Sequence, residues 1–305
     1  MIQFIVDAFT DKIFSGNPAA VCVAENFPAD EVMKNIAREN NLSETAFAVR
    51  QSNGYRLREN NGYKLRWFTP AGEIDFCGHA TLATAFVIFT QIERDLSEIN
   101  FETLRGNFSV TRRENLFEMN FPAYEYKKIQ VTDEMCDAIG ENVLEAYLSR
   151  DLLMILDGAD KVKNLTPNFE KLKNLNGLIQ AVTAKSTDEN FDCVSRIFAP
   201  KIKITEDPVT GATHCLIAPI WADKLHKNFL TCYQASERGG ILFCEIAGDR
   251  VKISGNAVLF ARSDLNLDIP NEITAAAIEE GRIIAEDNSV KGCTSISDFK
   301  AAVEN

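Results

Sequence analysis

The chain has 305 residues, of which 46% are hydrophobic and 25% are charged, and its formal net charge is −12. This composition is typical of a globular protein with a substantial core. A surface this acidic repels phosphate backbones, which excludes nucleic acid as a partner for most of the chain. No apolar run reaches the about 18 residues that span a bilayer, so we expect no membrane segment.

The eight cysteines are scattered through apolar runs and none forms a C-x-x-C pair. With no visible signal peptide at the N-terminus, this pattern predicts reduced, buried thiols in a cytoplasmic protein. The cysteines and the three histidines lack the clustered spacing of a structural zinc site, so we expect no metal site. The glycine patterns of dinucleotide and P-loop sites are also missing, so we expect no cofactor.

The first half of the chain alternates short strands with two helices. An amphipathic helix is predicted over about 30–40. A second helix follows Gly78 and is apolar on nearly every side over 80–88, which is typical of a buried central helix. A hairpin turn is predicted at 60–62. The predicted strands cover residues 2–6, 19–24, 46–49, 63–68, 99–103, 107–112 and 116–121.

A second unit begins near residue 126. It contains another apolar helix after Gly211, together with smaller helical segments predicted at 133–140, 159–165 and 168–175. The predicted strands cover residues 152–156, 178–183, 191–198, 229–235, 240–246, 251–254 and 257–261.

The starts of the two apolar helices are similar to each other. Phe68-x-Pro70 precedes Gly78, and Phe198-x-Pro200 precedes Gly211. We interpret this as an internal duplication, which predicts two similar α+β domains related by a pseudo-twofold axis. The alternative is a chance similarity between two strand–turn–helix connections.

A helix that begins with small residues exposes unpaired backbone N–H groups and the positive end of its dipole. Two such starts facing each other, at Gly78 and Gly211, could hold a substrate carboxylate or stabilise an enolate-like intermediate. The alternative is that both glycines serve only the geometry of a turn.

Three side chains near these helix starts are candidates for acid–base chemistry. Glu44 lies on a turn between a helix and a strand, and burial could raise its pKa enough for a general base, although a solvated surface glutamate has the same local sequence. His79 could donate to the substrate or carry a proton, or simply pack or cap. Asp207 could orient His79 or bind the substrate, or only begin the turn at Pro208.

Cysteine catalysis is an alternative, because Cys77 directly precedes Gly78. A two-base amino-acid racemase or epimerase requires a second thiol on the opposite face of the reacting carbon. The matching position before Gly211 is Thr210, and Cys215 is predicted to lie in the core. The missing partner argues against this mechanism.

Several blocks of the sequence, taken together and in order, resemble the PhzF-like (phenazine-biosynthesis-type) isomerase family, relatives of diaminopimelate epimerase and proline racemase. They span residues 1 to about 262. The blocks are Asp7-Ala8-Phe9-Thr10, Phe14-x-Gly16-Asn17-Pro18-Ala19-Ala20-Val21, Asn41-Leu42-Ser43-Glu44-Thr45-Ala46-Phe47, Arg66-Trp67-Phe68-Thr69-Pro70, Cys77-Gly78-His79-Ala80-Thr81, Glu206-Asp207-Pro208-Val209-Thr210-Gly211 and Arg238-Gly239-Gly240.

The resemblance implies an epimerase-like α+β fold with two pseudo-symmetric domains at residues 1–125 and 126–262. Each would be a curved, mostly antiparallel sheet around one central helix. It implies a cofactor-independent isomerase, commonly a homodimer, that acts on a small carboxylate-bearing substrate in the cleft between the domains.

The resemblance also implies roles for individual residues. The catalytic carboxylate falls on Glu44, with His79 and Asp207 assisting. The implied substrate contacts are Asn17, Gly78, Gly211, Ala212 and Thr213. Many members have serine where this chain has Ala212, which puts the substrate of the phenazine-forming members in doubt.

Beyond residue 262 the sequence predicts a helical extension. One helix opens at Asn271, and a capping-box pattern at 295–298 opens another. This tail looks like the C-terminal, toxin-contacting part of DinJ-type antitoxins. It is either an appendage that packs on the body or on a second copy, or a segment that binds a protein partner. The second possibility gives an alternative function, a binding or regulatory protein that uses residues 263–305.

Overall fold

A computed structural model describes residues 1–51, 62–267, 279–280 and 282. Residues Met1–Leu265 form one compact unit. Most of the predicted helical extension, including its antitoxin-like segment, lies outside the described residues, as do residues 60 and 61 of the predicted hairpin turn. None of the helices in the described part combines the length and the apolarity needed to cross a bilayer.

The described residues form seventeen strands that are hydrogen-bonded into one continuous sheet. Eight come from the first half of the chain: β1 (Ile2–Ala8), β2 (Asn17–Ala24), β3 (Glu44–Arg50), β4 (Gly62–Thr69), β5 (Gly72–Ile74), β6 (Glu98–Thr103), β7 (Gly106–Arg113) and β8 (Leu116–Pro122). Nine follow: β9 (Lys127–Ile129), β10 (Glu145–Leu148), β11 (Leu152–Ile155), β12 (Gln180–Lys185), β13 (Cys193–Phe198), β14 (Phe229–Gln234), β15 (Gly240–Ala247), β16 (Arg250–Gly255) and β17 (Ala257–Asp264).

Two pairings join the halves of the sheet. β16 pairs with β8, and β17 returns to pair with β1. Most neighbours are antiparallel; the pairs β2–β3, β4–β6, β11–β12 and β13–β14 are parallel. The predicted α+β class with curved, mostly antiparallel sheet is therefore confirmed, whereas the domain boundaries at residues 125 and 262 stay predictions.

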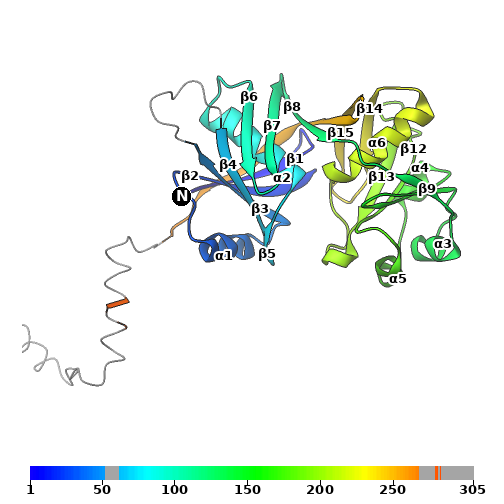
Figure 1. Ribbon diagram of the computed structural model, residues 1–305, viewed down its shortest axis with the longest axis horizontal. Helices are drawn as coiled ribbons and strands as arrows, with labels where there is room; N and C mark the ends of the chain where they lie inside the picture. Colours follow the sequence, from blue (N-terminus) through cyan, green and yellow to red (C-terminus); the bar gives the residue numbers. More distant parts are fainter. Residues whose placement is uncertain (52–61, 268–278, 281, 283–305) are drawn as a thin grey trace, which may run out of the picture. The chain divides into compact units, whose positions relative to one another are not determined.

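Each half of the sheet packs on one central helix, α2 (Gly78–Val87) or α6 (Gly211–Leu225) (Figure 1). Nine of the ten residues of α2 are buried, which explains why its sequence is apolar on nearly every side. α2 contacts β1, β2, β3, β8 and β17, and α6 contacts β14, β15 and β16. Both predicted central helices are confirmed.

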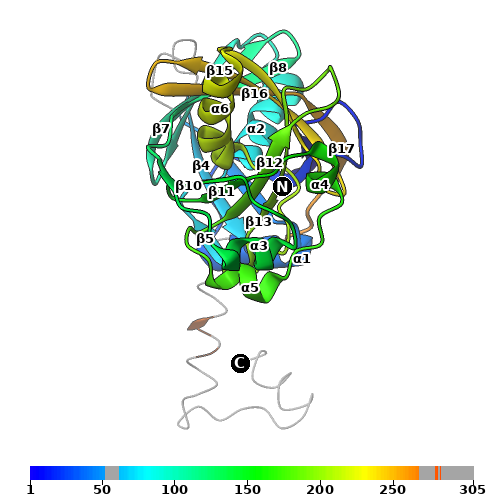
Figure 2. The ribbon, with the colours of Figure 1, turned by 90° about the vertical axis from the view of Figure 1, so that its right-hand side faces the viewer.

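The other helices lie outside the sheet. α1 (Asp30–Asn40) buries Met33, Ile36 and Ala37 on one face, as the sequence predicts. α3 (Asp133–Ile139), α4 (Ala159–Lys163) and α5 (Phe169–Asn174) cover a second hydrophobic cluster, and Figure 2 shows α3 and α5 side by side. The sequence did not predict the short strands β5, β9 and β10, because each mixes polar and apolar residues over only three or four positions, whereas the equally short β11 is apolar throughout and was predicted.

Candidate active site

Glu44 is the first residue of β3, two residues before the predicted start of that strand, and is not on a turn. Helix α1 ends at Asn40, and the left-handed backbone of the next residue, Asn41 (φ 49°), reverses the chain. The Asn40 amide then fixes this corner, since it donates to Gln3 Oε1 on β1 and to Thr45 Oγ1 on β3. Glu44 is consequently only 8% exposed.

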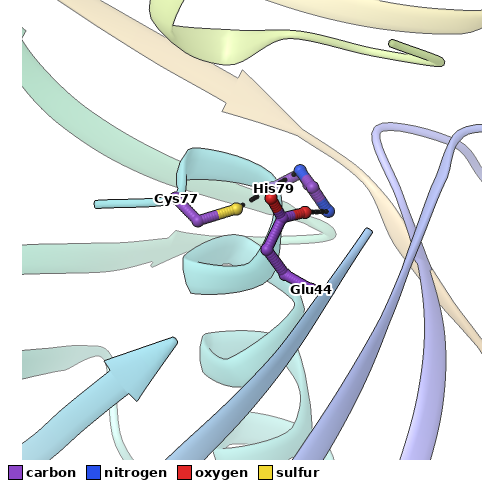
Figure 3. Close-up of side chains that lie close together, drawn as sticks. All are labelled: Glu44, Cys77 and His79. Carbon is purple, nitrogen blue, oxygen red and sulfur yellow. Dashed lines mark hydrogen bonds and ion pairs between the residues drawn. The ribbon is translucent and has the colours of Figure 1, made fainter. Parts of the chain in front are cut away.

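His79 faces Glu44 from the first turn of α2 (Figure 3). Its Nε2 atom lies 3.1 Å from Glu44 Oε2, and its Nδ1 atom lies 3.5 Å from Cys77 Sγ. The contact with Glu44 is an ion-pair contact without the alignment of a hydrogen bond. His79 Nε2 and Glu44 Oε2 are both buried, and neither has a hydrogen-bond partner among the described residues. The hydrogen-bonding capacity of both atoms is therefore unused among the described residues.

The Asn17 amide connects the two halves of the chain beneath the site. Its Nδ2 atom donates to Asp207 Oδ1 (2.8 Å) and to the Val209 carbonyl (2.9 Å), and lies 3.2 Å from His79 Nδ1. Since two oxygen acceptors face this atom, it must be the NH₂ group. A neutral His79 therefore carries its proton on Nε2, on the side of Glu44.

Asp207 lies in the loop that leads into α6. Gln234 on β14 fixes this loop, because its side chain donates to the Asp207 carbonyl and accepts from the Thr210 N–H group. The Thr210 hydroxyl donates to Asp207 Oδ2. Burial raises the pKa of Asp207 to about 6, although His79, Thr210 and Asn17 oppose this rise.

Burial also shifts the pKa values of Cys77 and His79, the two residues beside Glu44. It is the main cause that raises the pKa of the Cys77 thiol to about 11, with Glu44 adding to it, so Cys77 holds its proton at neutral pH. Burial alone lowers the pKa of His79, but the neighbouring Cys77 and Glu44 raise it, and the net direction is upward. Because Cys77 is protonated, Glu44 is the charge that favours the imidazolium form, whereas the Asn17 NH₂ group beside Nδ1 opposes it.

These residues line a cavity of about 300 Å³, which is at the small end of the range for ligand pockets. Both helix starts open into it: Gly78 is the first residue of α2, and Gly211 is the first residue of α6. Neither preceding residue, Cys77 or Thr210, caps its helix through a side chain. The backbone N–H groups in the first turn of each helix can therefore bind an anion.

Six of the eight predicted site residues line this cavity, namely Glu44, Gly78, His79, Asp207, Gly211 and Ala212. Asn17 and Thr213 are fully buried, and neither is among the described residues that line the cavity. The Thr213 hydroxyl instead donates to Asp151 Oδ2 (2.9 Å). In the structure Asn17 is positioned to hold His79 and Asp207, and Thr213 to hold Asp151.

Two arginines in the cavity wall, Arg105 and Arg150, were missed from the sequence. Each lies in a short connection, between β6 and β7 and between β10 and β11 respectively, with no motif around it. The sequence also did not indicate the apolar part of the wall, which includes Ile74, Phe76 and Ile179.

Glu44, Cys77 and His79 also offer three donor atoms that lie within 4.8 Å of one another, a set that could hold a metal ion. These are the atoms available for proton transfer, so a metal bound here would occupy the base. The expectation of a metal-free site stays a prediction.

Comparison with known proteins places the chain among isomerase-like relatives. A family model described as "Phenazine biosynthesis-like protein" (PhzC-PhzF) matches residues 6–263. An uncharacterized isomerase of Pseudomonas aeruginosa is 42% identical over 264 residues, which covers 87% of this chain and 98% of that protein.

Solved structures show the same relationship. The crystal structure of a PhzF-family protein of Enterococcus faecalis is 44% identical, superimposes with a TM-score of 0.82, and is matched over 87% of this chain and 99% of its own. A "probable proline racemase" of Agrobacterium radiobacter is similar in fold alone, with 11% identity, a TM-score of 0.55, and coverage of 90% and 95%.

Proposed function

The chain belongs to the phenazine biosynthesis-like (PhzC-PhzF) family and is an isomerase, and we propose that Glu44 moves a proton between two carbons of a small carboxylate-bearing substrate in the described cavity. The observation that carries this proposal is the combination of one buried carboxylate with two uncapped helix starts in a single small cavity. The substrate carboxylate binds at these helix starts, where N–H groups and helix dipoles favour negative charge.

In the proposed reaction Glu44 accepts a proton from a substrate carbon, and the electron pair of that C–H bond enters the conjugated system of the substrate. The helix starts stabilise the resulting enolate-like charge. Protonated Glu44 then returns the proton to a second carbon, so the double bond shifts and Glu44 regains its negative charge. No other reactant is consumed.

His79 and Asp207 have assisting roles in this scheme. His79 directs Nε2 towards Glu44 and orients the carboxylate. With a pKa of about 6, Asp207 can exist in either protonation state near neutral pH, so it can accept a hydrogen bond from a polar substrate group or donate one to it.

A racemase mechanism through Cys77 is less well supported. Its thiol has a pKa of about 11, which leaves little thiolate at neutral pH. The corresponding position at the start of α6 is Thr210, so this mechanism has no second thiol there.

The test is a panel of cyclic and open-chain unsaturated carboxylic acids, followed by proton nuclear magnetic resonance for movement of the double bond. Glu44→Gln should lower turnover by about 10²–10⁴-fold, the usual contribution of a positioned acid–base group. Glu118→Gln on β8 is a matched control, because Glu118 is partly buried but pairs with Arg113 outside the cavity. Undiminished turnover in Glu44→Gln would refute the proposal. The expected homodimer stays a separate prediction, which a measurement of the molecular mass in solution would test.

A further inference from the structure

Arg150 is a partly buried cation in the cavity wall, on the connection between β10 and β11. Its Nε and Nη2 atoms donate to the two carboxylate oxygens of Asp151, at 2.9 and 2.8 Å. Its guanidinium carbon lies 5.2 Å from the centre of the Tyr124 ring. The Nη1 atom has no hydrogen-bond partner among the described residues, and the side chain keeps 38% of its surface exposed.

Asp151 fixes the guanidinium in this orientation. Its side chain is fully buried, and Oδ2 also accepts the Thr213 hydroxyl from the first turn of α6. Because Asp151 is connected to both Arg150 and α6, the free edge of Arg150 has a set position relative to the Gly211 helix start. A preorganised guanidinium with free N–H groups is well suited to bind a carboxylate.

Arg196 shows what a purely structural arginine looks like in the same protein. It pairs with both oxygens of Glu206 and lies 5.2 Å from the Phe198 ring centre, as Arg150 does with Asp151 and Tyr124. Its Nη1 atom, however, donates to the carbonyls of Leu165 (2.6 Å) and Lys163 (3.3 Å). Arg196 is not among the described residues that line the cavity. Arg150 has the same pairing but leaves Nη1 unused.

We propose that Arg150 binds a second anionic group of the substrate, so that the isomerase acts on a dianion such as a dicarboxylate. One carboxylate binds at the helix starts, which rests on the proposed function, and the second accepts hydrogen bonds from Arg150 Nη1. The apolar wall around Ile74, Phe76 and Ile179 contacts the carbon skeleton between them. Arg150 is thus a specificity-determining residue that favours substrates with two negative charges over substrates with one.

The test compares affinities for probes that differ in one charge. Malonate, succinate, glutarate and adipate are titrated against the monoacids of the same chain length by calorimetry. At least one diacid should bind the wild-type protein about tenfold or more tightly than its monoacid, as expected for a charge-assisted hydrogen bond. Arg150→Gln should remove this preference, and Arg196→Gln should retain it. Absence of any diacid preference, or its survival in Arg150→Gln, would overturn the proposal.

Arg150→Gln leaves the buried Asp151 without its cation, which can destabilise the fold. A second variant, Arg150→Gln with Asp151→Asn, removes both charges and keeps an acceptor for Thr213. It should fold and also lack the diacid preference. Glu44→Gln separates this inference from the proposed function. If Arg150 binds the second anionic group, the Glu44→Gln variant still binds the diacid more tightly than the monoacid. The turnover of this variant tests only whether Glu44 is the base.

Discussion

The carboxyl group of Asp207 should make the stability of this protein depend on pH in an identifiable way. Burial raises its pKa from 3.8 to about 6 in the folded chain, so the folded state binds this proton more tightly than the unfolded state. The resulting stabilisation is complete below about pH 4 and is lost as the pH rises through about 6. Since a change of one in pKa corresponds to about 1.4 kcal/mol, Asp207 should account for a loss of about 3 kcal/mol between these limits.

The perturbation that isolates this effect is Asp207→Asn, which cannot titrate. Equilibrium urea unfolding of both proteins from pH 4 to pH 7.5 gives the free energy of unfolding at each pH. The variant should gain about 3 kcal/mol relative to the wild type as the pH rises. The altered hydrogen bonds to Asn17 and Thr210 change the free energy of unfolding by the same amount at every pH, because neither of these side chains titrates in this range. A difference between the two proteins that stays constant with pH would refute the reasoning.

Two further predictions concern residues next to Asp207 and Glu44. Asn17→Ala should lower the free energy of unfolding, measured in urea, by about 2–4 kcal/mol, because Asp207 and the Val209 carbonyl lose a buried donor. The affinity of this variant for a carboxylate probe should change little. A loss of affinity with unchanged stability would instead indicate that Asn17 contacts the substrate directly. Cys77→Ser should retain isomerase activity in the magnetic resonance assay, because its thiol is protonated at neutral pH; complete loss of activity would favour cysteine catalysis.

The sequence predicted the parts of this fold that leave a local pattern. The helices after Gly78 and Gly211 were predictable because their apolar faces extend all round, and the structure confirms both glycines as first helical residues. The strand that carries Glu44 was predicted with its start two residues too late. That error has a local cause, since Glu44 and Thr45 lack the apolar character that marks a strand.

The rest of the site depends on contacts between segments that are distant in sequence. Arg150 lies in a connection with no motif, and only the folded chain brings it to the wall that Glu44 also lines. Asn17 was predicted to bind substrate, yet its amide is directed at Asp207, 190 residues away. Side-chain direction of this kind follows from tertiary packing, which residue type and spacing do not encode.

The position of Asp207 relative to Glu44 depends on a second set of long-range hydrogen bonds. Arg238, from the second half of the chain, donates to Asp7 Oδ1 (2.7 Å) and to the Gly16 carbonyl (2.8 Å). Gly16 has φ +66°, and a Cβ atom there would lie 2.2 Å from the Ala8 carbonyl oxygen, so only glycine fits this turn. The turn places the next residue, Asn17, against His79 and Asp207. Because a misplacement of about 1 Å can cost 10²-fold in rate, we expect substitutions at Gly16 or Arg238 to lower turnover although neither residue lines the cavity.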